Sequence, residues 1–300
     1  MILCCGEALI DMLPRETAAG KPAFAPYPGG AVFNTAIALG RLGEQAGFFS
    51  GLSTDLFGQM LDKALTASGV DAGLARRSPR PTTLAFVTLT DGHAQYAFYD
   101  ENTAGRMLSP DDLPDLPESV EALFFGGISL VGDPCGAAYE ALMLREAGAR
   151  VTMLDPNIRP GFITAEPRYR ARIAAMLGAA DIVKVSDEDL AWIGATIEDL
   201  LAGGARLVCL TEGAKGVRAF WPGGESFVAA QRVEVVDTVG AGDTFNAGLL
   251  AGLARAGLLS KAGLAGLSAE ALAPALELGV AAAAITVSRA GANPPWEHEL

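Results

Sequence analysis

Residues 236–250 are VDTVGAGDTFNAGLL, and they mark a change in the type of secondary structure. The run VEVV that leads into them predicts a short strand, and TFNAGLLAGLARAG predicts a helix, so GAGD lies between the two. Gly240 and Gly242 allow backbone angles that other residues resist and carry no Cβ that would obstruct a ligand. The first N–H groups of a helix lack partners within it, and the helix dipole adds positive potential there. This junction is therefore a predicted anion site.

Asp243 shares the helix end with the predicted anion site. A carboxylate at this position can simply cap the helix. Beside a bound phosphate it would repel the ligand unless it held a metal ion or accepted a proton. A base that takes a proton from an attacking hydroxyl while a phosphoryl group arrives would account for it. The motif alone leaves both the capping and the phosphoryl-transfer interpretations open, and no GxxxxGK[ST] or GxGxxG motif occurs in the chain.

A second glycine-rich segment, PGGAVFNTAIALGRLG, covers residues 28–43. Gly29 and Gly30 permit close approach of the backbone, and Asn34 presents a donor and an acceptor near the predicted start of a helix. This arrangement suits recognition of a polyol. An ordinary capped helix is the alternative.

Elsewhere, short apolar runs alternate with longer helical patterns, which predicts an α/β fold with a mostly parallel sheet covered by helices on both faces. A hairpin is expected late in the chain, where GVRAFW and SFVAA flank a Pro-Gly-Gly turn. The strand candidates are ILCCGEALI, AGFFSGLS, EALFFGGISL, RVTMLDPN, DIVKVS and RLVCLTEG. The helix candidates are AVFNTAIALGRLG, DLFGQMLDKALTASG, PCGAAYEALMLREAG and residues 168–177.

Two segments interrupt this alternation, residues 12–28 and 82–104. The second contains two β-rich runs around Asp91-Gly92, a favoured hairpin turn, and predicts a small antiparallel sheet. The first segment follows directly after the first predicted strand. Both segments are therefore expected to meet over the C-terminal edge of the parallel sheet, where ligands bind in such folds. They would then form a lid. Two surface hairpins without a role in binding are the alternative.

The composition restricts the classes of function. A net charge of -13 argues against a nucleic-acid or anionic-membrane footprint. The apolar residues near 276–287 are too few for a membrane span and predict a buried core helix, and the N-terminus does not resemble a secretory signal, so we expect a cytoplasmic protein. Four cysteines without CxxC spacing and two histidines make a zinc site or a histidine-based triad improbable on composition alone.

PGGxxxN near the N-terminus and DTxGAGD near the C-terminus, in this order, resemble the two signatures of the ribokinase-like (PfkB) family of sugar kinases. The resemblance extends from Gly6 to Pro295. It implies one domain over residues 1–300, a three-layer α/β/α sandwich with a mostly parallel central sheet, and a β-sheet lid formed by about 12–28 and 82–104. It also implies ATP and Mg²⁺ as cofactors and a small sugar as acceptor.

The resemblance assigns roles to individual residues of this sequence. Asp243 matches the catalytic base, and Gly240, Ala241 and Gly242 match the anion hole for the transferred phosphoryl group. The sugar-contacting positions correspond to Asp11, at the end of the first strand, and to Gly29, Gly30 and Asn34. The nucleotide positions correspond to Lys184, Thr211, Gly213, Gly216 and Asn293.

The metal positions depart from the family pattern. The family commonly has an N-x-x-E motif that organises Mg²⁺ through water, whereas KVSDED here places Ser186 and Asp189 at those positions, with Glu188 adjacent. The family also binds a monovalent cation, K⁺, in some members. The corresponding positions are Asp237, Thr238, Ser288 and Gly291.

The acceptor sugar is suggested by DPNIRPGF, residues 155–162, and YAFYDENTAGRML, residues 96–108, which look most similar to fructokinases. Arg106 and Arg159 are the cations expected near the acceptor. Because Arg binds hydroxyls, carboxylates and phosphates alike, a 2-keto-3-deoxygluconate kinase or a ribokinase remains an alternative, as does a sugar- or nucleotide-binding sensor without activity. The resemblance further implies a homodimer, since lid edges in the family often pair between subunits.

Overall fold

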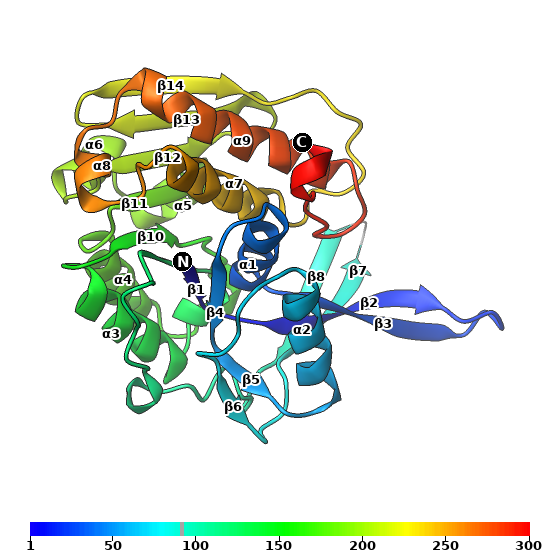
Figure 1. Ribbon diagram of the computed structural model, residues 1–300. Coiled ribbons are helices and arrows are strands. Elements are labelled where there is room, and N and C mark those ends of the chain that lie inside the picture. The colour runs from blue at the N-terminus through cyan, green and yellow to red at the C-terminus, as the bar shows by residue number, and fades with distance from the viewer. Residues whose placement is uncertain (91–92) are drawn as a thin grey trace.

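A computed structural model of the protein describes residues 1–90 and 93–300 (Figure 1). The Asp91-Gly92 turn predicted from the sequence lies outside the described residues. The chain builds one large sheet, one small sheet and the helices that cover the large one.

The large sheet has eight strands in the order β14-β13-β12-β11-β10-β9-β1-β4. The six strands from β12 to β4 in this order are parallel. Strands β13 and β14 form the expected antiparallel hairpin at one edge of the sheet. Side chains of β1, β4, β9 and β10 are buried on both faces, as near-continuous apolar runs predict. The strands are β1 Ile2–Cys5, β4 Ala46–Phe49, β9 Ala122–Gly126, β10 Val151–Asp155, β11 Ile182–Ser186, β12 Leu207–Thr211, β13 Gly216–Trp221 and β14 Gly224–Ala229.

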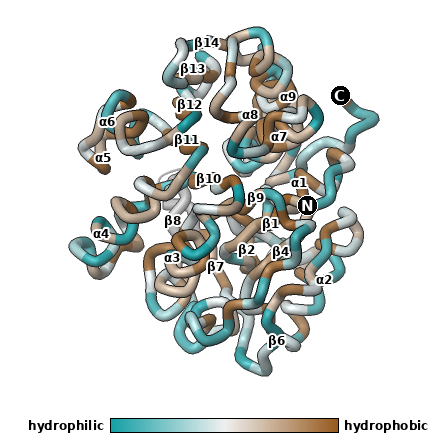
Figure 2. The backbone as a smooth tube through the Cα atoms, turned by 60° about the vertical axis from the view of Figure 1, so that its left-hand side comes forward, coloured by the Kyte–Doolittle hydropathy of each residue, from teal (hydrophilic) through white to brown (hydrophobic). Residues whose placement is uncertain are grey.

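Helices cover both faces of this sheet, so the predicted α/β sandwich is confirmed (Figure 2). One face packs against α1 Ala31–Arg41, α2 Leu56–Ala67, α7 Ala241–Arg255, α8 Lys261–Ala265 and α9 Ala269–Val287. The other face packs against α3 Cys135–Glu146, α4 Glu166–Leu177, α5 Asp187–Ile193 and α6 Ile197–Ala202. Single 3₁₀ turns occur at Pro110–Asp112, Ile128–Leu130, Pro160–Phe162, Gly213–Lys215 and Glu297–Glu299.

Helices α7 and α9 pack so closely that their backbones meet at small residues. A Cβ on Gly248 would lie 2.6 Å from the Cα of Gly279, and a Cβ on Gly252 would lie 2.4 Å from the Cα of Ala275. By length and composition alone, α9 could cross a membrane. Its buried residues, which include Leu276, instead belong to the cluster around α7, and this agrees with the core helix expected near residues 276–287.

The small sheet has the order β3-β2-β7-β8 and projects from one side of the molecule (Figure 1). Its strands are β2 Leu9–Glu16, β3 Pro22–Gly29, β7 Leu84–Thr90 and β8 His93–Tyr99. It is not wholly antiparallel as expected, because β2 and β7 pair in parallel. A further parallel pair joins β5 Gly51–Ser53 to β6 Arg76–Ser78.

Three expected strands need correction. ILCCGEALI is not one strand: it is interrupted at residues 6–8, and its last two residues begin β2 of the small sheet. A Cβ on Gly6 would lie 2.4 Å from a methyl group of Val32, so α1 packs directly over this break. AGFFSGLS divides in the same way between β4 and β5. VEVV forms no regular strand: among residues 1–90 and 93–300 no strand pairs with it, and Val235 and Val236 are exposed.

Candidate active site

A cavity of about 810 Å³ lies where the C-terminal ends of the parallel strands meet the small sheet. Segments far apart in the sequence contribute to it, among them β2, α1, β11 and the start of α7. It brings together most of the residues singled out from the sequence. These are Asp11, Gly30, Asn34, Arg159, Lys184, Glu188, Asp189, Thr211, Gly213, Thr238, Gly240, Ala241, Gly242 and Asp243.

The start of α7 presents bare backbone to this cavity. Gly240 precedes the helix with φ 79°, a conformation that favours glycine. Within the part of the chain that the structure describes, the amides of Gly242 and Asp243 donate no hydrogen bond, and the Ala241 amide makes only a long one, 3.4 Å, to the carbonyl of Thr238. The helix therefore offers two unpaired N–H groups and the positive end of its dipole to an anion.

Asp243 lies in the first turn of α7 and its side chain is only 8% exposed. The side-chain amide of Asn34 donates a hydrogen bond of 2.9 Å to Oδ2 of Asp243, and the Thr35 hydroxyl donates to its carbonyl at 3.2 Å. Burial raises the pKa of Asp243 to about 7, against the smaller lowering effect of Asn34. A carboxyl group with a pKa near neutrality is suited to exchange a proton at physiological pH.

Asp11 faces the same cavity from β2, in the small sheet rather than at the end of a strand of the large sheet as expected. Burial raises its pKa to about 6. Gly29 lies on the neighbouring strand β3, where it pairs with Leu9, and a Cβ on Gly29 would come within 2.2 Å of Oδ2 of Asp11. The absence of a side chain at Gly29 is thus what allows Asp11 its place.

Glu7, which the sequence analysis did not single out, binds the first amide of α1 and so holds the N-terminus of this helix at the cavity. Its carboxylate accepts hydrogen bonds from the amides of Ala31 at 2.8 Å and Ser129 at 3.2 Å. Burial raises the pKa of Glu7, and hydrogen bonds from Ser129 and from the Val32 amide oppose that effect. An acidic residue between two apolar runs was the available signal. Its partners, more than twenty and more than one hundred residues away, were not visible in the sequence.

Lys184 lies on the floor of the cavity, and its side chain is 7% exposed. Its ammonium pairs with Oδ2 of Asp155 at 3.1 Å. Burial alone would lower the pKa of Lys184, but the carboxylates of Asp155, Asp189 and Asp243 outweigh it and raise that pKa. Lys184 thus remains a cation directly beneath the first turn of α7.

Ser186 and Asp189 cap helix α5. The amide and the hydroxyl of Ser186 donate to Oδ2 of Asp189 at 2.9 and 2.7 Å, and the Ile158 amide donates to Oδ1 at 2.8 Å. Both oxygens of Asp189 are therefore occupied, while Glu188 is exposed at the cavity edge. Residues 1–90 and 93–300 contain no cluster of three His, Cys, Asp or Glu side chains that is placed to hold a metal ion.

The four residues predicted for a monovalent cation lie in two adjoining loops. Asp237 accepts a hydrogen bond from the amide of Gly291 at 2.9 Å and from that of Val239 at 3.0 Å. The Ser288 hydroxyl donates to the carbonyl of Ile285 at 2.7 Å. Thr238 of this group reaches the cavity.

Arg106, Gly216 and Asn293 lie outside the cavity lining, as do Gly29, Asp237, Ser288 and Gly291. Arg106 pairs with Asp100 at 2.8 Å and donates to the carbonyl of Asp133 at 2.8 Å, so its guanidinium joins the end of β8 to the start of α3. Asn293 accepts a hydrogen bond of 2.8 Å from Arg41. Gly216 begins β13, where a Cβ would come within 2.1 Å of the Val228 carbonyl oxygen.

Two aromatic rings lie between the small sheet and the body. Phe98 of β8 meets Phe162 of the 3₁₀ turn after β10, with ring centroids 4.6 Å apart in an edge-on arrangement. Both residues line the cavity. The small sheet therefore contacts the body at the cavity through apolar surface.

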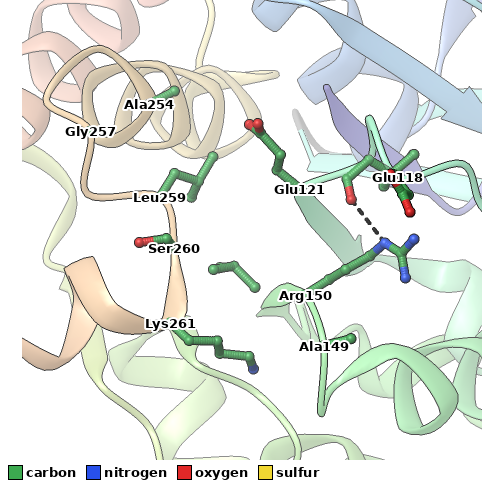
Figure 3. A pocket seen from close by; sticks show the side chains of 11 residues that line it. Glu118, Glu121, Ala149, Arg150, Ala254, Gly257, Leu259, Ser260 and Lys261 are labelled. Atoms are coloured by element: carbon green, nitrogen blue, oxygen red, sulfur yellow. Dashed lines mark hydrogen bonds between the residues drawn. The ribbon is translucent and has the colours of Figure 1, made fainter.

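A second cavity, of about 620 Å³, lies at the N-terminal ends of β9 and β10, beside the segment between α7 and α8 (Figure 3). Arg150 donates to the carbonyl of Val120 at 2.8 Å, and Lys261 pairs with Asp181 at 2.6 Å. Both of these cations therefore already have partners.

The chain is similar in sequence and in structure to proteins of known function. Residues 1–299 match the model of the "pfkB family carbohydrate kinase". A fructokinase of Rhizobium leguminosarum bv. trifolii is 57% identical over 84% of this chain and 79% of its own. The structure of a fructokinase of Xylella fastidiosa with bound ATP superposes with a TM-score of 0.89, at 30% identity over 97% of this chain and 93% of that one. A fructokinase of Vibrio cholerae O395 bound to fructose, ADP and calcium gives a TM-score of 0.82 at 27% identity, over 97% of this chain and 94% of that one.

Proposed function

Because the chain belongs to the pfkB family of carbohydrate kinases, we propose that it transfers the terminal phosphoryl group of ATP to the primary hydroxyl of fructose, which yields fructose 6-phosphate and ADP. One observation carries the proposal. The Asp243 carboxylate faces the cavity beside two amides of α7 without partners. A base and an anion site thus coincide, as in-line phosphoryl transfer requires.

In the proposed reaction, Asp243 accepts the proton of the primary hydroxyl while the hydroxyl oxygen forms a bond to the terminal phosphorus of ATP. The bond between that phosphorus and the bridging oxygen breaks, and ADP leaves with the bonding electrons. The amides of Gly242 and Asp243 donate to the phosphoryl oxygens, where negative charge is concentrated. The ammonium of Lys184 adds a full positive charge beneath the same turn.

The sugar would be held on the small-sheet side of the cavity. Asp11 and Asn34 supply a carboxylate and an amide that can bind several hydroxyls at once. Gly29 leaves room for Asp11, and Gly30 lines the cavity without a side chain that would obstruct the sugar. Arg159 lines the same cavity and is the cation suited to a polar acceptor. The Phe98–Phe162 contact would close over the sugar and exclude water, which gives the small sheet the role of a lid.

The nucleotide would enter along Thr211 and Gly213 and lie against the loop before α7. With both oxygens of Asp189 occupied, Mg²⁺ is better supplied as a complex with ATP, since this ion keeps several waters and binds substrate phosphates readily. Glu188 remains available to such waters. We also propose the loops of Asp237 and Gly291 as a site for K⁺. We further propose that the protein acts in the cytoplasm, where ATP is available as the phosphoryl donor.

The test is a screen of ADP release by the purified protein with fructose, 2-keto-3-deoxygluconate, ribose and adenosine. Fructose is expected to give the highest kcat/KM, and ³¹P NMR should identify the product as the 6-phosphate. If only 2-keto-3-deoxygluconate is phosphorylated, the acceptor is this sugar acid and not fructose, and Arg159 is the group expected to bind its carboxylate. Binding of fructose by calorimetry without any turnover would indicate a sensor instead.

A further inference from the structure

Two oppositely charged residues lie side by side beneath the first turn of α7. Asp155 ends β10 and Lys184 lies in β11, and the pairing of Leu154 with Val183 makes them neighbours. Their ion pair of 3.1 Å is almost completely buried, with side chains 3% and 7% exposed. A buried ion pair is seldom more stabilising than apolar residues of similar size, so its position favours a functional explanation.

Asp155 is held in place from two further directions. The side-chain amide of Asn246, which lies on α7, donates to Oδ2 of Asp155 at 2.7 Å. The backbone amide of Asn157 donates to Oδ1 at 3.1 Å. The carboxylate is therefore fixed relative to both the sheet and the helix above it.

The ammonium of Lys184 lies close to α7 as well. A Cβ on Gly242 would be only 3.3 Å from Nζ of Lys184. The charges of Lys184 and Asp243 influence each other. Among the residues that the structure describes, however, Lys184 forms its ion pair with Asp155 and none with Asp243.

We propose that Asp155 is a positioning residue that holds the Lys184 ammonium out of contact with Asp243, so that the ammonium faces the arriving phosphoryl group and the Asp243 carboxylate stays free to accept a proton. This inference rests on the proposed kinase function. Without Asp155, the buried ammonium would find its nearest alternative partner in Asp243. A carboxylate paired with an ammonium is a weaker base.

The groups that act on Asp243 come from several elements. They are Glu7 between β1 and β2, Asn34 on α1, Asp155 on β10 and Lys184 on β11. Asp11 on β2 lines the same cavity, and Asp189 on α5 acts on Lys184. Arg159 also lines this cavity, but among the groups that act most strongly on Asp243 the positive one is Lys184, so the position of its ammonium affects how strongly Asp243 is stabilised as an anion.

The kinetic test compares Asp155→Asn with the double variant Asp155→Asn/Lys184→Met over a range of pH. In the single variant, kcat at pH 8 should fall about tenfold or more, and the acid-side midpoint of kcat/KM should move down by about one pH unit. In the double variant, the ammonium is gone, so the midpoint should return to the wild-type value or above. A midpoint unchanged in the single variant would overturn the inference.

A crystal structure of Asp155→Asn tests the same inference without activity. Nζ of Lys184 is expected within hydrogen-bond distance of Asp243; an ammonium that stays in place or turns elsewhere contradicts the proposal. Should Asp155→Asn fail to fold, Asp155→Ser also removes the carboxylate and should lower the midpoint in the same way, so an unmoved midpoint there has the same adverse meaning. Asp155→Glu keeps a carboxylate beside the ammonium and should keep the wild-type midpoint. A wild-type protein that phosphorylates no sugar would refute the proposed function, while the crystal structure would still decide the arrangement of charges.

Discussion

At the scale of single residues, Asp243 combines burial with a position at the end of a helix, and these two conditions separate its proposed role from ordinary capping. Asp199 occupies the equivalent third position of α6, where it is exposed and accepts hydrogen bonds from the Thr196 amide and hydroxyl. Asp199 therefore caps its helix. Asp243 instead accepts from the side chain of Asn34 and faces the cavity.

Asp243→Asn is expected to lower kcat by about 10²-fold or more, because the amide cannot accept the proton of the sugar hydroxyl. The Kd for sugar, measured by calorimetry, should change little, since the side chain keeps its shape and its acceptor for Asn34. ADP release gives the rate. Asp199→Asn is the matched control and should retain wild-type kcat; equal losses in the two variants would point to a structural effect.

The same substitution is expected to stabilise the protein. The pKa of Asp243 is about 7 in the folded state and near 3.8 in the unfolded one, so its contribution is favourable below pH 4 and is lost as pH rises to 7. Asp243→Asn should therefore gain about 1–4 kcal/mol of unfolding free energy at pH 8 and much less at pH 4.5. Urea unfolding at both pH values measures the difference.

Asp199→Asn is the control for this stability measurement, because the pKa of Asp199 is shifted in the opposite direction to that of Asp243. Hydrogen bonds from Thr196 lower the pKa of Asp199, so its contribution exists at neutral pH and disappears on acidification. Asp199→Asn should consequently be no more stable than wild type at pH 8. A gain in both variants would indicate a general effect of reduced negative charge.

The pH dependence of catalysis follows from the two carboxyl groups in the cavity. Only ionised Asp243 can accept a proton, so kcat/KM for fructose should fall below about pH 7. Asp11, with a pKa of about 6, must be ionised to accept hydrogen bonds at full strength from the sugar, so the decline should steepen below that pH. A plateau that extends down to pH 5 would contradict both assignments.

At the scale of elements, the small sheet has two different faces. Asp11 and Phe98 are on the inner face, toward the cavity. Phe24, Phe86 and Tyr99 form a row of edge-on rings on the other face, with centroid distances of 5.0 and 5.4 Å. Alternation along each strand separates the two groups.

Phe98→Ala tests the closing function of the inner face. Loss of the ring contact with Phe162 should raise KM for fructose several-fold and increase ATP hydrolysis without sugar transfer, because water gains entry to the cavity. Comparison of ADP formed with sugar phosphate formed measures this leak. Tight coupling with an unchanged KM would show that Phe98 has no part in closure.

The sequence predicted those elements whose signal is local. The buried strands from β9 to β12 and the helices α2 and α3 follow from apolar runs and helical periodicity alone. The division of ILCCGEALI between two sheets was missed because it depends on Val32 packing against Gly6. The irregular course of VEVV was missed because a strand forms only where another strand pairs with it, and that pairing depends on the whole fold.

At the scale of the whole molecule, the motifs predicted which residues surround the cavity, but not the charge pairs beneath it. GAGD and PGGxxxN are short segments whose glycines carry their own conformational signal. Asp155, Lys184 and Asn246 meet only because β10, β11 and α7 come together. Likewise, the connection that Arg106 makes between β8 and α3 depends on Asp133, which no motif identifies.

We predict that the protein is a homodimer that pairs through its small sheets. The order β3-β2-β7-β8 leaves β3 and β8 as edges, and an uncovered edge strand tends to pair with another chain. Phe24 and Tyr99 are 43% and 63% exposed on the outer face, and they would be buried by such pairing. Light scattering should therefore give twice the mass of one chain.

The variant Phe24→Ser/Tyr99→Ser should shift this mass toward that of a single chain and raise KM for fructose, since the unpaired lid would lose support. Phe227→Ser is the matched control, because Phe227 is an exposed aromatic residue, at 47%, on the edge strand β14 of the large sheet. It should remain dimeric. A dimer that survives the double substitution, or that is lost in the control, would place the interface away from the small sheet and leave closure of the cavity to each chain alone.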